Sequence, residues 1–176
     1  MTGDDVALAD GTVVRIREIR PEDADALVAF HARLSPQSII LRYFGPHPRL
    51  SDSEVHRLTN VDGVDRYAVV ALLDDRIVGV ARYEREPGSP EAEVAFLVTD
   101  ELQGKRLGTV FFERLVEAAR RQGITRLVAD TLAENTRMLG VFRDSGYRRH
   151  YDRFSEVVQV VLDIDEDGVG ADGDPA

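Results

Sequence analysis

A glycine-bearing loop joins a predicted buried strand, residues 91–98, to a predicted amphipathic helix that Gly123 closes. The loop reads QGKRLGT over residues 103–109, with two glycines and two cationic side chains. A loop of this kind at a helix start presents unbonded backbone N–H groups and the positive end of the helix dipole, which together bind phosphate without any particular side chain. An ordinary strand-to-helix connection has the same glycines, so the loop alone leaves both interpretations open.

The composition indicates one soluble globular domain. With 176 residues and 43% apolar content, the chain can form one proper core but hardly two. No apolar run reaches the roughly 20 residues that span a bilayer, and the first residues do not form a basic, hydrophobic signal. The absence of cysteine excludes disulfides, thiolate nucleophiles and cysteine-based zinc sites, so a cytoplasmic location is expected.

The formal net charge of −10 is concentrated at the two ends of the chain. Residues 1–11 form an acidic extension, and residues 165–176 predict an acidic, disordered tail. The domain between them, residues 12–164, is nearly neutral and has no basic patch. Neither nucleic acid nor a membrane is therefore expected as a partner. His47 and His56 lack carboxylates at metal-ligand spacing, so we expect no metal.

The hydrophobic periods predict a mixed α/β fold. Strands are expected over residues 12–19, 67–73, 76–85, 91–98, 124–129, 147–154 and 156–163. Helices are expected after Pro21, over residues 37–44, from a capping box at Ser51, after the glycine loop and over residues 135–145. Asp74-Asp75 predicts a tight hairpin. The strand at 124–129 must run near-parallel to the strand at 91–98, because a helix crosses between them.

Residues 103–108 resemble the acetyl-CoA loop of the GNAT N-acetyltransferases, whose pattern is Gln/Arg-x-x-Gly-x-Gly/Ala. Gln103 and Gly108 match this pattern, whereas Arg106 stands where the first glycine of the family lies. The order of elements also resembles the GNAT order over residues 12–163. The resemblance implies a single GNAT-type α/β domain with a mostly antiparallel central sheet flanked by helices. In it, a splayed parallel strand pair forms the acetyl-CoA cleft.

Three segments are similar, more narrowly, to the Pat-type protein lysine acetyltransferases of bacteria. They are LSPQS with LRYF, at residues 34–38 and 41–44, and AEVAF, at residues 92–96. This similarity implies an acetyl-CoA-dependent acetyltransferase whose acceptor is a primary amine, first of all a protein lysine. A small amine is the same chemistry with a different pocket, and a module that binds acyl-CoA without turnover is a further alternative. The chain would act as a monomer or a homodimer.

Acetyl transfer to an amine needs a base, because a lysine-like ammonium with a pKa near roughly 10.4 has no free lone pair at neutral pH. Glu93 is the candidate base, since the resemblance places it where Pat-type enzymes carry their catalytic glutamate. By strand alternation it shares a face with Ala95 and Leu97, and apolar neighbours would raise its pKa. Without the resemblance, a solvated carboxylate at a strand edge is the simpler interpretation.

The resemblance also assigns groups to the cofactor. Backbone groups around Leu97 would bind the pantetheine arm and the oxyanion, and loop N–H groups would bind the pyrophosphate. We expect Arg106 to donate to a phosphate or to point outward, provided that the backbone there needs no positive φ. The predicted cofactor contacts are Phe96, Leu97, Val98, Gln103, Gly104, Lys105, Arg106, Leu107, Gly108, Thr109, Asn135 and Phe142.

Three further assignments stay open at this stage. Many GNAT enzymes use a tyrosine in the last helix to protonate the leaving thiolate, and that position here is Phe142, which cannot donate a proton. Water would then protonate the thiolate, or the thiolate would leave as such. Asn135 either contacts the cofactor or simply caps its helix. Tyr43, Tyr67 and Tyr83 could each line the acceptor cleft or belong to the core.

Overall fold

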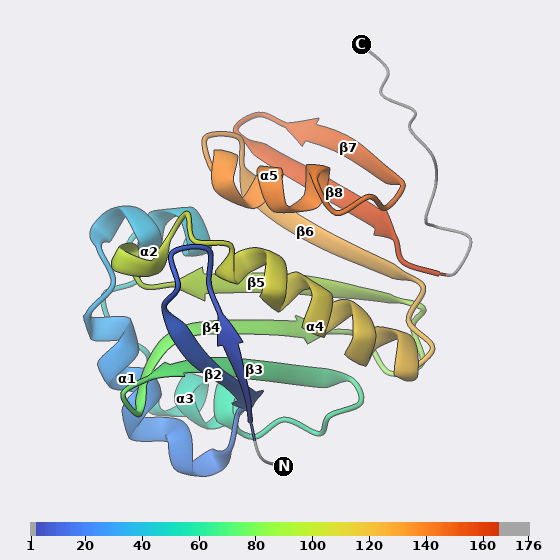
Figure 1. Cartoon of the computed structure of the whole chain (residues 1–176). Helices are drawn as coiled ribbons and strands as arrows, with labels where there is room; N and C mark the ends of the chain where they lie inside the picture. The colour runs from blue at the N-terminus through green and yellow to red at the C-terminus, as the bar shows by residue number, and fades with distance from the viewer. Residues whose placement is uncertain (1–2, 166–176) are drawn as a thin grey trace.

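A sheet of eight strands organises residues 3–165, which are the residues that the computed structural model describes (Figure 1). The spatial order is β1-β2-β3-β4-β5-β6-β8-β7, and only the β5–β6 pair is parallel. The strands are β1 (Asp4–Ala7), β2 (Val13–Glu18), β3 (Arg66–Leu73), β4 (Arg76–Glu84), β5 (Glu91–Val98), β6 (Arg126–Leu132), β7 (Arg149–Phe154) and β8 (Val157–Asp163). The helices are α1 (Ala24–Ala32), α2 (Pro36–Tyr43), α3 (Asp52–Thr59), α4 (Leu107–Arg121) and α5 (Thr136–Arg143), with 3-10 turns at Pro21–Asp23 and Asp100–Leu102.

The predicted mixed α/β fold, with a mostly antiparallel sheet and one parallel pair, is confirmed. Local signals account for much of this agreement. Ser51 caps α3, since its Oγ accepts from the Glu54 N–H (3.2 Å) and the Glu54 carboxylate accepts from the Ser51 N–H (2.7 Å). Asp74 and Asp75 both have positive φ, at 51° and 59°, as the tight turn between β3 and β4 requires.

Strand β1 was not predicted, and it lies within the acidic extension assigned to residues 1–11. It pairs antiparallel with β2 and forms an edge of the sheet. Its carboxylates have basic partners, because Asp4 pairs with Arg114 of α4 (2.7 Å) and Asp5 with Arg15 of β2 (3.0 Å). A short acidic strand has no hydrophobic alternation that could reveal it. The predicted tail, apart from Asp165, lies outside the described residues.

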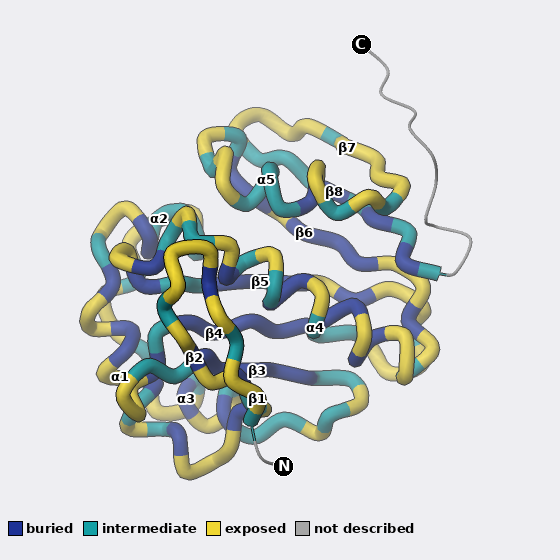
Figure 2. The backbone as a smooth tube through the Cα atoms, viewed as in Figure 1, coloured by how far each residue is buried: buried dark blue, intermediate teal, exposed yellow. Residues whose placement is uncertain are grey.

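The two faces of the sheet are covered by different helices. On one face, α4 and α5 pack over the larger core, to which Phe111 and Phe112 of α4 and Phe142 of α5 contribute. On the other face, α1 and α2 enclose a second core, with Phe30 against Val80 of β4 among its members. Figure 2 shows β3 and β4 buried along most of their length, whereas β7 is largely exposed at its edge of the sheet.

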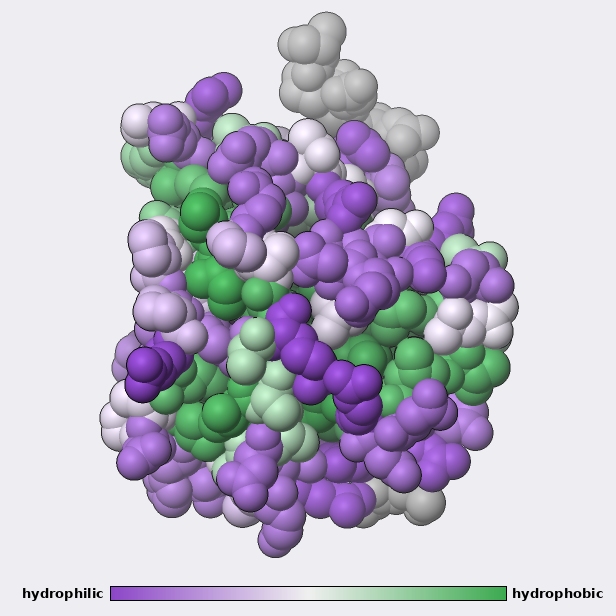
Figure 3. Space-filling model, turned by 90° about the vertical axis from the view of Figure 1, so that its left-hand side faces the viewer, coloured by the Kyte–Doolittle hydropathy of each residue, from purple (hydrophilic) through white to green (hydrophobic). Residues whose placement is uncertain are grey.

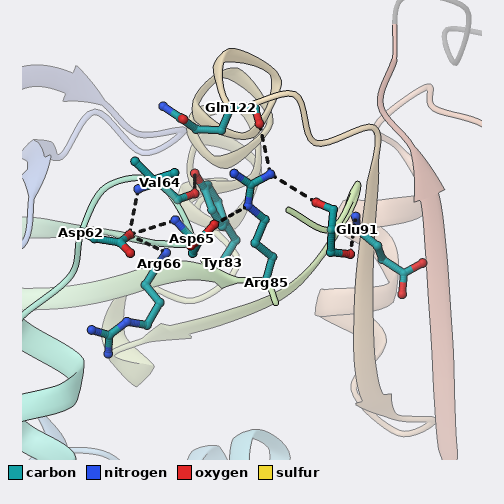
Figure 4. A network of polar contacts seen from close by, with 9 residues as sticks. Asp62, Val64, Asp65, Arg66, Tyr83, Arg85, Glu91 and Gln122 are labelled. Carbon is teal, nitrogen blue, oxygen red and sulfur yellow. Dashed lines mark hydrogen bonds and ion pairs between the residues drawn. The ribbon is translucent and has the colours of Figure 1, made fainter. Parts of the chain in front are cut away.

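A partly buried polar network fastens the N-terminal end of β5 to its surroundings (Figure 4). The Arg85 guanidinium donates from Nε to Asp65 Oδ1 (2.8 Å), and from Nη1 to the carbonyl groups of Ser89 (3.2 Å) and Gln122 (3.1 Å). Beside it, the Tyr83 hydroxyl donates to the Val64 carbonyl (3.1 Å). The loop before β3, the turn before β5 and the end of α4 are thereby held together at one end of the sheet.

Within residues 3–165, no helix combines the length and the apolar character needed to cross a membrane. The same part of the chain contains no group of three or more His, Asp or Glu side chains arranged to hold a metal ion.

Candidate active site

Strands β5 and β6 are paired only at their N-terminal ends. Backbone pairing joins Glu91 to Arg126, Ala92 to Leu127 and Glu93 to Val128, and it stops there although both strands continue. Each strand stays paired on its other side, β5 with β4 and β6 with β8. The two strands therefore separate beyond Glu93, and the edges that they turn toward each other are left unpaired.

The unpaired edge of β5 carries the backbone groups of alternate residues. The Thr99 N–H donates to the Val78 carbonyl next to β4 (2.9 Å), whereas the Val98 carbonyl accepts from Gln103 Nε2 (3.0 Å). Because successive residues of a strand direct their N–H and C=O groups to opposite edges, the N–H groups of Phe96 and Val98 face the gap, and that of Leu97 faces β4. The Phe96 side chain is buried in the core, so only its backbone is available to a ligand.

The start of α4 lies beside this edge and has free donors. Val110 is the first helical residue with a bonded N–H, which donates to the Arg106 carbonyl (3.2 Å). The N–H groups of Leu107, Gly108 and Thr109 have no acceptor in the described part of the chain. The Leu107 side chain is buried and the Thr109 side chain is exposed. Free N–H groups and the helix dipole make this helix end suited to a phosphate.

The carboxylate of Glu93 lies where the two strands part. It is exposed, and it forms no hydrogen bond or ion pair with any residue in the described range 3–165. Partial removal from water raises the pKa of Glu93, and the Asp130 carboxylate raises it further, while the Arg42 guanidinium of α2 acts in the opposite direction. Asp130 follows Val128 by two residues on β6, so it lies on the Glu93 face of the sheet.

A recess with both apolar and cationic walls lies on the same face as Glu93. Ala95 and Leu97, the next residues of β5 on that face, line it together with Arg42 of α2 and Arg82 of β4. Figure 3 looks onto the side where α1 and α2 lie and shows hydrophobic side chains gathered between hydrophilic ones. Neither arginine was predicted as a site residue. Arg82 is paired with Ala95 of β5, so both residues lie on the Glu93 face. Alternation along β4 was the signal that could have assigned Arg82 to this face.

The family model for the acetyltransferase (GNAT) domain matches residues 14–148 of the chain. The chain belongs to the GNAT family of acetyltransferases. An acetyltransferase of Pseudomonas aeruginosa is 32% identical to this GNAT chain over 136 residues, which are 75% of this chain and 73% of that protein.

Solved structures of other proteins are similar over nearly the whole chain. The GNAT domain of S. lividans Pat has a TM-score of 0.85 and 37% identity, covering 92% of this chain and 96% of that one. YncA from Salmonella typhimurium, solved with its cofactor acetyl-CoA, has a TM-score of 0.70 and 18% identity, covering 87% and 95%. A cAMP-binding acyltransferase from Mycobacterium smegmatis has a TM-score of 0.68 and 24% identity, and this chain spans 50% of it while 97% of this chain is covered. The last two similarities concern the fold alone.

The loop of this GNAT domain departs from the family pattern at a conformationally demanding position. Arg106 has a left-handed backbone, with a φ of 70°. Gly104, two residues earlier, also has a positive φ, of 76°. The condition that the backbone at this position needs no positive φ is therefore not met, and the glycine of the family pattern has a physical reason. An L residue in this region costs about 1–2 kcal/mol that glycine avoids. The Arg106 side chain is exposed to solvent.

Two other loop side chains are held by neighbours. The Lys105 ammonium pairs with Asp10 Oδ2 (2.8 Å) in the turn between β1 and β2, and this contact lowers the pKa of Asp10. Gln103 donates from Nε2 to Ser38 Oγ of α2 (2.9 Å) as well as to the Val98 carbonyl, and it accepts from Arg137 Nη1 of α5 (2.5 Å). Gln103 thus joins α2, β5 and α5, and leaves the N–H groups at the helix start free.

The remaining predicted residues have structural roles in the described fold. Asn135 caps α5, since its Oδ1 accepts from the Met138 N–H (3.3 Å). Phe142 is 0% exposed and packs against the rings of Phe96 and Phe112, with centroids 6.2 and 5.6 Å away. A ligand could contact the Phe142 ring only if this aromatic cluster opened.

The three candidate tyrosines divide between the two faces of the sheet. Tyr43 lines the recess beside Glu93, where burial raises its pKa. Tyr67 and Tyr83 belong to the larger core on the opposite face and stack on each other, with ring centroids 5.5 Å apart. Of the three, only Tyr43 is placed to contact an acceptor.

Proposed function

We propose that the chain is an acetyl-CoA-dependent N-acetyltransferase that modifies a primary amine, with a protein lysine as the first candidate acceptor. The observation that carries this proposal is the position of Glu93 at the point where β5 and β6 separate. Within residues 3–165 this carboxylate has no bonded partner, and it lies beside an unpaired backbone edge. The helix start with free donors lies on one face of the sheet, and the recess lies on the other face, which is that of Glu93. The proposed catalytic domain covers residues 12–164.

The donor side of the site fits acetyl-CoA by the chemistry of its groups. Acetyl-CoA supplies a thioester as the acyl donor, a pantetheine arm and a pyrophosphate. The free N–H groups of Leu107, Gly108 and Thr109 would bind phosphate oxygens. The N–H groups of Phe96 and Val98 would serve the pantetheine arm or the acyl oxygen. Gln103 would act indirectly, because its side chain is already engaged with Ser38 and Val98.

On the acceptor side, Glu93 would take a proton from the ammonium, directly or through one water. A raised pKa suits this role, because the carboxylate becomes a stronger base while it remains ionised near neutral pH. The freed amine nitrogen then attacks the acyl carbon, and the C–S bond breaks. Phe142 is buried and has no proton to give, so water would protonate the departing sulfur.

The similarity to the GNAT domain of S. lividans Pat supports a protein lysine as acceptor. A small amine would use the same base and donor site, and a module that binds acyl-CoA without turnover would use the donor site alone. The unbonded Glu93 carboxylate favours turnover over the last alternative. The cysteine-free composition favours action in the cytoplasm.

The test is release of the CoA thiol from acetyl-CoA in the presence of lysine peptides and small amines. The chain has no cysteine, so a thiol reagent reports only the released CoA. Wild type should release thiol with a lysine peptide, and not with the same peptide carrying arginine instead of lysine. Glu93→Gln should lower this rate by about 100-fold or more while acetyl-CoA binding persists. Binding without any amine-dependent thiol release would support the non-catalytic module instead.

A further inference from the structure

Arg82 is a buried cation that forms no ion pair with an acidic side chain within residues 3–165. Its residue exposure is 7%, and both terminal nitrogens of its guanidinium donate only to the Leu58 carbonyl, over long distances of 3.4 Å. The nearest acid along β4, Glu84, is engaged elsewhere, since it accepts from Arg57 at 2.7 and 3.0 Å. A guanidinium has five N–H donors, so Arg82 has donors left over. Burial lowers the pKa of Arg82 to about 10.

A second cation shares the recess with Arg82. Arg42 of α2 lines the same walls and lies over the ring of Tyr43, 4.9 Å from its centroid. Arg42 is near enough to both other charged groups to lower the pKa of Arg82 and that of Glu93. Two arginines therefore face one recess that opens on the side of the proposed base.

Apart from His31 and Tyr43, the other side chains that line the recess are apolar. Leu27 and Phe30 of α1, Leu50, and Leu58 of α3 contribute to its walls. A buried arginine among such side chains is costly unless a charge compensates it, and substitution by an apolar residue of similar size is often neutral or stabilising. The long contacts with the Leu58 carbonyl compensate this buried charge only weakly, which points to a ligand that supplies an anion.

We propose that Arg82 and Arg42 bind a carboxylate of the acceptor, so that the acceptor carries an anionic group close to the amine that approaches Glu93. This inference rests on the proposed acetyltransferase function and narrows its substrate class. The carboxylate could belong to a free amino acid with an apolar side chain or to an acidic residue beside the target lysine of a protein. Planar guanidinium groups suit carboxylates because they can donate two parallel hydrogen bonds.

The first test measures binding of a carboxylate that has no amine. We would titrate 4-methylpentanoate and, as the neutral control, 4-methylpentanamide into wild type, Arg82→Met and Arg76→Met, following amide shifts by NMR. Arg76 is an exposed residue of the same strand and serves as the matched variant. Wild type and Arg76→Met should bind the carboxylate at least about tenfold more tightly than the amide, and Arg82→Met should lose this preference. Equal binding of both probes by wild type would overturn the proposal.

Thermal unfolding of Arg82→Met separates a binding role from a structural one. A binding role predicts a melting temperature equal to or above that of wild type, because a buried charge has been removed. If Arg82→Met unfolds early, Arg42→Met, at a less buried position, replaces it in the titration. Retention of carboxylate preference by both variants would contradict the inference.

The second test uses turnover to distinguish the two sources of the carboxylate. Leucine is compared with leucinamide, and acetyl-Ala-Glu-Lys-Ala-amide with its Gln-Lys counterpart. For each pair, kcat/KM of the carboxylate-bearing acceptor is divided by that of its neutral counterpart. The two acceptors of a pair differ in amine pKa, but this difference cancels when the ratio is compared between wild type and Arg82→Met. If the ratio of one pair is about tenfold lower in Arg82→Met than in wild type, that pair identifies the source of the carboxylate. Unchanged ratios in both pairs would contradict the inference. If none of these amines supports thiol release, the result would count against the proposed transferase. The NMR titration would still decide whether the carboxylate binds.

Discussion

Glu93 of β5 and Val128 of β6 form the last paired position of the two parallel strands. On one side of this pair, the Pro90 carbonyl accepts from the N–H groups of Thr125 (2.8 Å) and Arg126 (3.1 Å), and the Arg85 network fixes the adjoining turn. On the other side the strands separate. The candidate base thus stands where a rigid end of the sheet meets an open one, which fixes its position without a side-chain contact.

The pH dependence of acetyl transfer should report the raised pKa of Glu93. Because the base must be ionised, kcat/KM should rise with pH through a pKa above the usual glutamate range. Asp130→Asn removes a neighbouring negative charge, so it should shift this limb to lower pH. Arg42→Met removes a positive charge and should shift it to higher pH. Profiles that coincide for all three proteins would show that Glu93 does not control the rate.

Thermal unfolding of Glu93→Gln should separate catalysis from folding. A carboxyl group whose pKa is raised by folding stabilises the protein fully below its unfolded pKa, and this contribution is lost as pH rises through the folded pKa. The melting temperature of Glu93→Gln relative to wild type should therefore increase between pH 4 and pH 8. A variant that becomes relatively less stable over this range would contradict the assigned shift.

The Arg85 network should be more sensitive to mutation than an exposed ion pair of the same fold. The Arg85 side chain is 9% exposed, and removing it leaves Asp65 and two carbonyl groups without their donor. Arg85→Ala should therefore lower the free energy of unfolding by about 3–5 kcal/mol. Arg15→Ala, which breaks the exposed pair with Asp5, is the matched control and should cost less than about 1 kcal/mol. Denaturant unfolding measures both, and equal losses would contradict the role of burial.

The left-handed backbone at Arg106 predicts an unusual order of variant stabilities. Arg106→Gly removes about 1–2 kcal/mol of backbone strain from the folded state. The glycine also raises the entropy of the unfolded chain, which costs about 0.4–1 kcal/mol of stability. The variant should therefore be as stable as wild type or slightly more stable. Arg106→Val places a β-branched residue in the same conformation and should be less stable than wild type. Chemical denaturation checks this order, and a stable valine variant would show that the loop adopts another conformation.

Local signals in the sequence were sufficient for most of the architecture. The capping box at Ser51, the turn at Asp74-Asp75 and the C-terminal glycine Gly123 act through near neighbours, and each element that they bound is present. The parallel β5–β6 pair followed from the intervening helix. The end of β6 and the whole of β1 could not be predicted from local signals, because short strands depend on partners that lie far away in the chain.

The site was only partly visible in the sequence, for a related reason. The family pattern marked the loop and Glu93, but the residue type at Arg106 gives no sign of a left-handed backbone. The burial of Arg82 depends on helices from elsewhere in the chain that close over β4. The same helices set Tyr43 apart from Tyr67 and Tyr83, which alternation alone could not assign to a face without the register.

The most direct test of the account is calorimetric titration of acetyl-CoA into wild type, Thr109→Glu and Thr109→Gln. Thr109 is exposed in the first turn of α4, where a glutamate favours the helix but repels a phosphate on the free N–H groups. Wild type and Thr109→Gln should bind alike, and Thr109→Glu should bind at least about tenfold more weakly without a loss of thermal stability. Absence of binding to wild type, or equal binding to Thr109→Glu, would contradict the placement of acetyl-CoA at this helix start.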